Sequence, residues 1–385
     1  MILRTGQNDE GTVTTADTRD TDVVLDKLSP LDKFLPVWIL AAMAAGLLLG
    51  TVLPVFGQAL ESVKIAGVSV PIAVGLLVMM YPVLAKVRYN ETARVMADKR
   101  LIVTSLAINW LLAPAFMFAL AWIFLADLPE YRTGLIIVGL ARCIAMVLIW
   151  NDLACGDREA AAVLVAVNSV FQVFMFGVLG WFYLQLLPSW LGLATTTTEF
   201  SLWAITLSVL VFLGVPLLAG FLTRTVGEAR MGRSAYEAKV LPVIGPWALY
   251  GLLFTIVVLF ALQGDQVLSQ PFEVLRIAVP LLIYFVVTFF ASMLIGWLLR
   301  MGYRRSTTLS FTAAGNNFEL AIAVSIATFG AASGQALAGV VGPLIEVPVL
   351  VGLVYVALWA RKFFPSAQEP TVAEPTAQPE PARTF

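Results

Sequence analysis

Residues 133–151 read TGLIIVGLARCIAMVLIWN, which places Arg142 and Cys143 in the middle of an apolar run. A second run of this kind, residues 306–330, reads STTLSFTAAGNNFELAIAVSIATFG and contains Glu319. Apolar runs of about twenty residues are long enough to cross a bilayer. A charged group inside hydrocarbon costs at least ~2.5–3.5 kcal/mol on insertion scales, so both runs indicate functional sites.

The composition of the whole chain is that of a membrane protein. Of its 385 residues, 59% are apolar and 13% are charged, whereas soluble domains have about 45–50% and about 25%. The net charge of −1 leaves no basic surplus of the kind that nucleic-acid binding requires. Histidine is absent, which excludes an imidazole base, a histidine pH switch and metal sites that need imidazole.

Ten apolar runs near twenty residues long predict an all-α membrane protein with ten transmembrane helices. Twenty residues at a rise of 1.5 Å cover roughly 30 Å, the thickness of the hydrocarbon core. The predicted spans are residues 34–53, 68–85, 101–126, 133–151, 160–187, 200–223, 240–263, 277–299, 306–330 and 336–360. Residues 1–30 are rich in acidic side chains, which predicts a disordered tail. Residues 364–385 are rich in Pro and Glu, which predicts a second, extended tail.

Lysine and arginine gather in alternate loops, which places both termini in the cytoplasm by the positive-inside rule. Ten spans divide into two halves of five, residues 31–190 and residues 191–363. An odd number of spans in each half makes the second half enter from the opposite side, so any repeat must be inverted. A short internal match supports a repeat, because Gly139-x-x-Arg142-Cys143 in the first half corresponds to Gly315-x-x-Phe318-Glu319 in the second.

Small and polar residues cluster in the fourth and ninth predicted spans. Glycine and asparagine in mid-span indicate helices that break, and such breaks form the sites of inverted-repeat transporters. Other polar groups lie inside the fifth and tenth spans, where Asn168 and Gln172 are one helical turn apart. The candidate site residues beyond Cys143 and Glu319 are Gly139, Arg142, Asn151, Asn168, Gln172, Gly315, Asn316, Asn317 and Glu346.

One sulfur and one carboxylate at matched positions suggest a site that binds a soft centre and carries a proton. Arg142 beside Cys143 favours the thiolate, which ligates soft centres, and Glu319 can carry a proton. Structural interpretations stand beside these. Arg142 can be a counter-ion for Glu319 or for backbone carbonyls, Glu346 can belong to a kink at Pro348, and Asn168 with Gln172 can join helices.

Three motifs in order along the chain resemble a known family. They are MMYP at residues 79–82, ARCIAMV at residues 141–147 and GNNFELAIA at residues 315–323. They resemble the arsenite permeases, the arsenical-resistance exporters of the bile acid/arsenite/riboflavin transporter superfamily. The resemblance extends over residues 31–363 and leaves both tails uncovered.

The resemblance implies efflux of arsenite, with antimonite as a second candidate substrate, across the cytoplasmic membrane in exchange for protons. It implies inverted repeats whose fourth and ninth helices are discontinuous and cross, with spans three to five and eight to ten moving against the others. The family's essential cysteine falls on Cys143, the ligand of As(III), and its essential carboxylate on Glu319. Asn316 and Asn317 would bind the substrate's hydroxyls, with Glu346 as the next proton carrier. No cofactor is expected.

Four other functions fit the sequence less well. A sodium-coupled transporter of bile acids or other organic anions with the same architecture would use several carboxylates at the crossing, and it gives Cys143 no role. A sodium/proton antiporter needs paired aspartates in mid-span, and the predicted span interiors contain none. A membrane receptor or sensor needs a sensing domain or a signalling output, for which the tails are too short. No catalytic cluster indicates an enzyme.

Overall fold

The structure is a computed structural model that describes residues 34–52, 64–65, 68–87, 98–144, 146–195, 202–330 and 333–364. Nearly all of these residues are helical, and the one sheet among them pairs two short strands, β1 (Lys64–Ile65) and β2 (Val68–Ser69). Six helical segments of the described chain are long and apolar enough to cross a membrane, and three further apolar helices are shorter. The predicted tail 1–30 and all but the first residue of the tail 364–385 lie outside the described residues.

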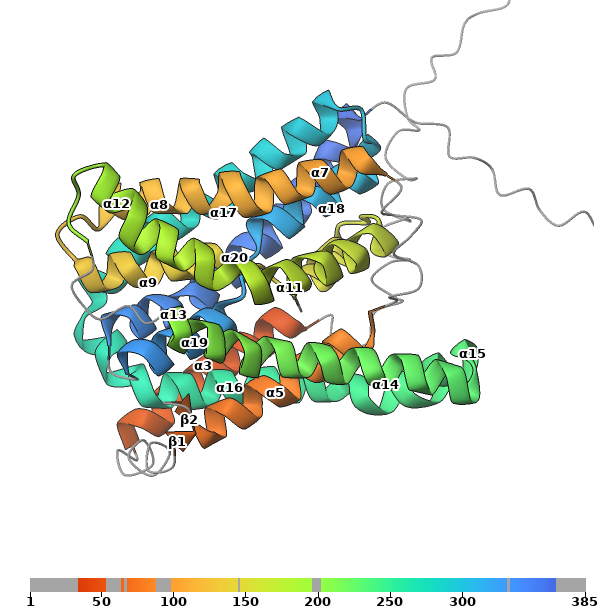
Figure 1. The fold of residues 1–385 in the computed structure, drawn as a ribbon, viewed down its shortest axis with the longest axis horizontal. Helices are drawn as coiled ribbons and strands as arrows, with labels where there is room; N and C mark the ends of the chain where they lie inside the picture. The colour runs from red at the N-terminus through yellow and green to blue at the C-terminus, as the bar shows by residue number, and fades with distance from the viewer. Residues whose placement is uncertain are drawn as a thin grey trace, which may run out of the picture.

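The helices form two bundles that lie one above the other in Figure 1. The smaller bundle consists of α3 (Leu35–Val52), α5 (Val70–Ala85), α13 (Leu202–Val209), α14 (Val215–Met231), α15 (Arg233–Ala235) and α16 (Leu241–Ser269). The larger bundle consists of α7 (Lys99–Ala107), α8 (Ala113–Phe124), α9 (Pro129–Leu140), α10 (Met146–Leu153), α11 (Arg158–Trp181), α12 (Leu187–Trp190), α17 (Pro271–Leu298), α18 (Gly302–Ala314), α19 (Phe318–Phe329) and α20 (Gly334–Ala360). A 3₁₀ turn, Arg361–Phe363, follows α20.

Four junctions between consecutive helices are π-helical turns, and proline explains each of them. The turns are Ile108–Leu112, Phe182–Leu186, Leu210–Gly214 and Tyr236–Val240. The second residue after each turn is a proline, Pro114, Pro188, Pro216 and Pro242 in chain order. Proline lacks the N–H group and its ring clashes with the carbonyl four residues earlier, so the hydrogen-bond register widens there without ending the helix.

Glycines allow the helices of the smaller bundle to pack closely. Gly46 and Gly50 lie one turn apart on α3 and face α16. A Cβ at Gly50 would lie 2.5 Å from the carbonyl oxygen of Ala261, and one at Gly46 would lie 2.6 Å from that of Val257. Small residues at this spacing bring two helix backbones together where van der Waals packing drives association in lipid.

The substitution Gly50→Ala should therefore separate α3 from α16. We expect a loss of about 1–3 kcal/mol of stability, typical of overpacking, seen as a lower melting temperature in detergent. Gly352→Ala is the matched control, since a Cβ at Gly352 would meet no atom within 4 Å. Equal melting temperatures for the two variants would contradict the close packing of α3 on α16.

Candidate functional site

Two helices of the larger bundle are interrupted, and the two interruptions meet. The helix α9 ends at Leu140 and α10 begins at Met146, while α18 ends at Ala314 and α19 begins at Phe318. Between them, Arg142 and Asn316 form an antiparallel bridge. The backbone N–H of Cys143 donates to the carbonyl of Gly315 over 3.3 Å, and that of Asn317 donates to Ala141 over 3.0 Å. Each break thus supplies hydrogen bonds that the other lacks.

The register of this bridge differs from the alignment in the short internal match of the sequence. Arg142 faces Asn316, whereas the motif match aligns Arg142 with Phe318, two positions further along the chain. Cys143 bonds Gly315 across the bridge, while Glu319 lies in the first turn of α19. The two glycines of the motif match occupy different places: Gly139 lies inside α9, whereas Gly315 is the C-cap residue of α18.

Arg142 is completely buried and binds to the ends of both interrupted helices. Its guanidinium donates to the carbonyl of Gly139 in α9 and to the hydroxyl of Tyr284, 2.8 Å away. It also approaches the carbonyl of Ala313 in α18, at 3.4 Å. A cation is stabilised at helix C-termini because their carbonyl groups carry partial negative charge. Arg142 thus bonds backbone carbonyls, as one of the two structural alternatives expects, and no ion pair with Glu319 is present among the described residues.

Asn316 and Asn317 each use one side-chain atom to hold the fold and leave the other without a partner. The side-chain nitrogen of Asn316 donates to the carbonyls of Val138, at 2.7 Å, and Ala141, at 3.2 Å. The side-chain oxygen of Asn317 accepts from the N–H of Leu320 over 3.0 Å and caps α19. The oxygen of Asn316 and the side-chain nitrogen of Asn317 are both buried without a partner in the described part of the protein. One acceptor and one donor therefore remain for a ligand.

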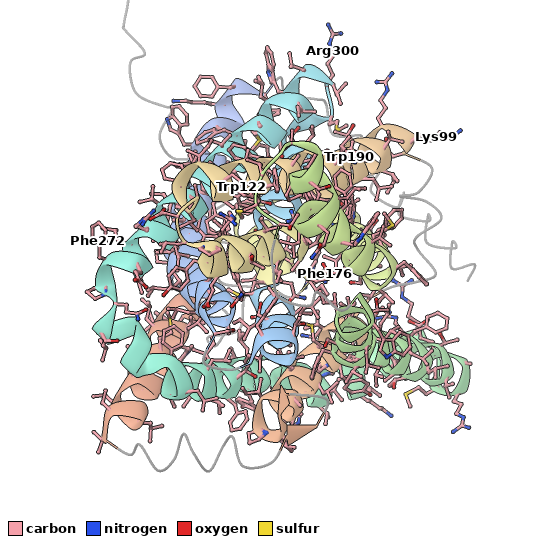
Figure 2. The ribbon with its side chains drawn as sticks, turned by 60° about the vertical axis from the view of Figure 1, so that its left-hand side comes forward. Lys99, Trp122, Phe176, Trp190, Phe272 and Arg300 are labelled. Atoms are coloured by element: carbon pink, nitrogen blue, oxygen red, sulfur yellow. The ribbon has the colours of Figure 1, made fainter. Side chains whose placement is uncertain are left out.

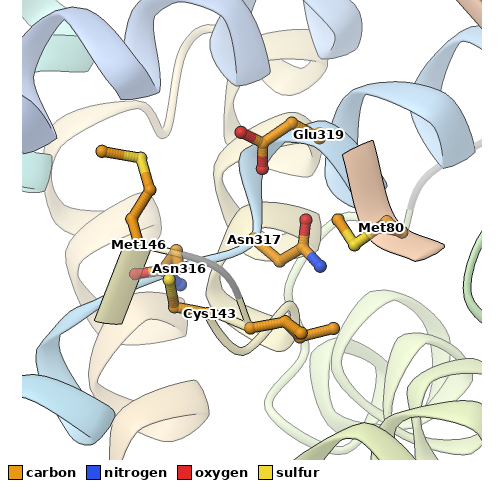
Figure 3. Close-up of a pocket in the computed structure, with 7 residues that line it drawn as sticks. Met80, Cys143, Met146, Asn316, Asn317 and Glu319 are labelled. Atoms are coloured by element: carbon orange, nitrogen blue, oxygen red, sulfur yellow. The ribbon is translucent and has the colours of Figure 1, made fainter. Parts of the chain in front are cut away.

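The place where the two breaks pair, residues 141–143 and 315–317, is called the crossing below. A pocket opens beside the crossing (Figure 3). It is lined by Met80, Cys143, Ile144, Met146, Asn316, Asn317 and Glu319. Cys143 is buried and lies three residues before the start of α10. The structure thus brings together the four residues that the sequence predicts to bind substrate. Ile144, Met80 and Met146 were missed as site residues, although both methionines fall inside the motifs that carry the family resemblance.

Glu346 lies behind the crossing, away from the lining of this pocket. Its side chain is 2% exposed, and its carboxylate accepts from the N–H of Asn316 over 3.1 Å. Gly315 lies close by, since a Cβ there would be 3.0 Å from that of Cys143 and 3.4 Å from the Glu346 carboxylate. Gly139 faces Met117, whose Cγ would be 2.5 Å from a Cβ.

The remaining predicted residues join helices. Asn151 accepts from the hydroxyl of Thr308 over 2.7 Å, which holds the end of α10 against α18. Asn168 accepts from the indole of Trp110 over 3.0 Å. Gln172 accepts from the backbone N–H of Arg142, and it is the member of this group that reaches the crossing. Figure 2 shows how densely side chains fill the space between the helices of the bundle.

An all-helical membrane protein in which two broken helices meet beside a pocket with a thiol, two amides and a carboxylate has the architecture of a transporter. Comparison with known proteins agrees with this class. The Sodium Bile acid symporter family matches residues 73–270. The arsenical-resistance protein Acr3 of Corynebacterium glutamicum is 62% identical over 91% of this chain and 96% of its own length. That of Alkaliphilus metalliredigens is 32% identical over 87% of this chain and 94% of its own length.

An uncharacterized transporter of Synechocystis is 34% identical over 89% of this chain and 92% of its own length. The chain therefore belongs to the sodium bile acid symporter family, and within it to the group of the arsenical-resistance proteins. The protein is an integral membrane transporter.

Replacing Arg142 should test the role of the crossing in stability. Arg142→Ala leaves the carbonyls of α9 and α18 without their cation, and we expect a loss of about 3–5 kcal/mol, seen as low protein levels in the membrane. Tyr284→Phe removes the hydroxyl that accepts from Arg142 and donates to the carbonyl of Ala313, and should cost about 1–3 kcal/mol. Arg158, whose side chain is 81% exposed, provides the control substitution Arg158→Ala. Wild-type levels of Arg142→Ala would show that another group holds the two breaks together.

Proposed function

We propose that this protein exports arsenite, with antimonite as a second substrate, across the cytoplasmic membrane in exchange for protons, and thereby confers arsenic resistance. One observation carries the proposal. A single pocket joins a thiol, two amides with unused hydrogen-bonding atoms and a carboxylate, in a chain closely related to proteins named for arsenical resistance.

The pocket suits the chemistry of arsenite, which is mostly neutral As(OH)₃ near neutral pH. Its arsenic is soft and prefers sulfur, and its hydroxyls both donate and accept hydrogen bonds. Cys143 would contact the arsenic, while the free oxygen of Asn316 and the free nitrogen of Asn317 would bind hydroxyls. A single thiol holds arsenic weakly enough for release, which transport requires.

Glu319 is the proposed proton carrier. It lines the pocket and is partly exposed there, so a proton can reach it from the same space as the substrate. Glu346 is the second candidate, because its carboxylate is already engaged with the backbone of Asn316. Binding of a proton and of the substrate in one pocket would couple the two movements.

Ten spans in two inverted repeats, residues 31–190 and 191–363, are part of the proposal. The paired hydrogen bonds at the crossing support it, and so do contacts outside the crossing. Tyr131 bonds Glu273 at one end of the bundle, and Arg305 bonds Asp98 over 2.6 Å at the other. If the two repeats are aligned so that Arg142 corresponds to Asn316, Tyr131 corresponds to Arg305. In the same alignment Asp98 corresponds to the residue just before Glu273, so the two contacts join equivalent places in the two repeats.

Alternating access would follow if the larger bundle rocks against the smaller one. The pocket lies where the crossing faces α5 of the smaller bundle, because Met80 of α5 is among its lining residues. The basic loops place both termini in the cytoplasm. Movement of the larger bundle would then expose Cys143 and Glu319 first to one side and then to the other.

Cys143→Ser should abolish arsenite uptake into inside-out membrane vesicles, since the hydroxyl is a poor ligand for arsenic. Protein level, measured by immunoblot, should remain that of the wild type because serine is similar in size. Cys155→Ser is the matched control and should transport normally. Full transport by the Cys143→Ser vesicles would remove sulfur from the mechanism.

Glu319→Gln should make arsenite transport independent of an imposed pH gradient, because the amide cannot carry a proton. Accumulation would be compared in vesicles with acidic and with neutral interiors. If the variant still accumulates arsenite in proportion to the gradient, the proton carrier is another group, and Glu346→Gln is the next variant to measure.

Sodium-coupled transport of an organic anion is the second candidate, favoured by the family match. The same vesicles separate the two functions. Replacement of sodium by choline should leave arsenite uptake unchanged, and taurocholate should be neither accumulated nor inhibitory. Sodium-dependent accumulation of taurocholate would favour the second candidate.

A further inference from the structure

We propose that Met80 contacts the transported metalloid and sets the preference between antimonite and arsenite. The inference rests on the proposed function and assigns a further residue to the same pocket. Met80 is 3% exposed and contributes to the lining from α5. The other lining residues come from the crossing and from the first turns of α10 and α19.

The position of Met80 differs from that of every other residue of the pocket. Figure 3 shows Met80 and Met146 on opposite sides of the group that Cys143, Asn316 and Asn317 form, with Glu319 nearby. Among the described residues that line the pocket, Met80 is the one from the smaller bundle. A substrate held by the larger bundle would therefore meet Met80 when the two bundles are together, and would leave it when they separate.

The preceding residue shows that this placement is specific. Met79 is also buried, at 1% exposure, but it is absent from the pocket lining. It packs within the smaller bundle, where a Cβ at Gly251 of α16 would lie 2.7 Å from its backbone nitrogen. Successive residues of a helix point about 100° apart, so the side chains of Met79 and Met80 face different neighbours, and that of Met80 lines the pocket.

A thioether differs from a thiol in the contact that it offers. Its sulfur is soft and polarisable, but it has no proton to lose and does not displace a hydroxyl group from the metalloid. Met80 would therefore add attraction without adding a covalent bond that slows release. Antimony is larger and more polarisable than arsenic, so loss of the sulfur should weaken binding of Sb(OH)₃ more than binding of As(OH)₃.

The test is the transport of both substrates by wild type, Met80→Leu and Met79→Leu in the same vesicles. Leucine removes the sulfur and nearly keeps the volume, so the helix packing should persist. For Met80→Leu we expect the ratio of antimonite to arsenite kcat/KM to fall by about two- to tenfold. For Met79→Leu the ratio should equal that of the wild type.

A second measurement, the rise in melting temperature that each metalloid produces in detergent, should show the same change of preference without transport. An unchanged ratio in Met80→Leu, or an equal loss of both substrates, would overturn the inference and leave the proposed function standing. Failure of the wild type to move either metalloid would instead overturn the proposed function.

Discussion

The antiparallel bridge between Arg142 and Asn316 is the interaction on which the rest of the structure depends. Backbone groups inside a bilayer find no water, so a broken helix is tolerated only where another part of the protein satisfies its free N–H and C=O groups. Here two breaks satisfy each other, and the guanidinium of Arg142 neutralises the carbonyl ends of both helices. The site exists because these residues are extended and not helical.

The crossing also explains why the candidate site contains one hydrogen-bond acceptor and one donor without a partner. Asn316 uses its donor group on the carbonyls of α9, and Asn317 uses its acceptor on the cap of α19. Each amide is thereby fixed in orientation and keeps one unused atom beside Cys143. Preorganisation of this kind lets weak contacts select a small neutral solute, and binding remains reversible.

In the described helices, four prolines follow a π-helical turn that takes up the hydrogen bond each proline lacks, whereas α17 and α20 carry prolines in their interiors. The smaller bundle is held together differently, by glycines that bring α3, α5 and α16 into backbone contact. Two internally well-packed bundles with a pocket between them are the parts that a rocking mechanism needs. Because histidine is absent, the proposed proton coupling falls to carboxylates, of which Glu319 lines the pocket and Glu346 accepts from the backbone of Asn316.

Apolar helices long enough for a membrane, the two breaks, and Cys143, Asn316, Asn317 and Glu319 as candidate residues could be predicted from the sequence, because hydrophobic length and polar groups inside apolar runs are local signals. Only the tertiary structure decided the register of the crossing, in which Arg142 faces Asn316 and not Phe318, and the partners of Arg142. It also decided which of two adjacent methionines lines the pocket. Such contacts join positions far apart in the chain, and their geometry depends on how whole helices pack, which no local pattern records.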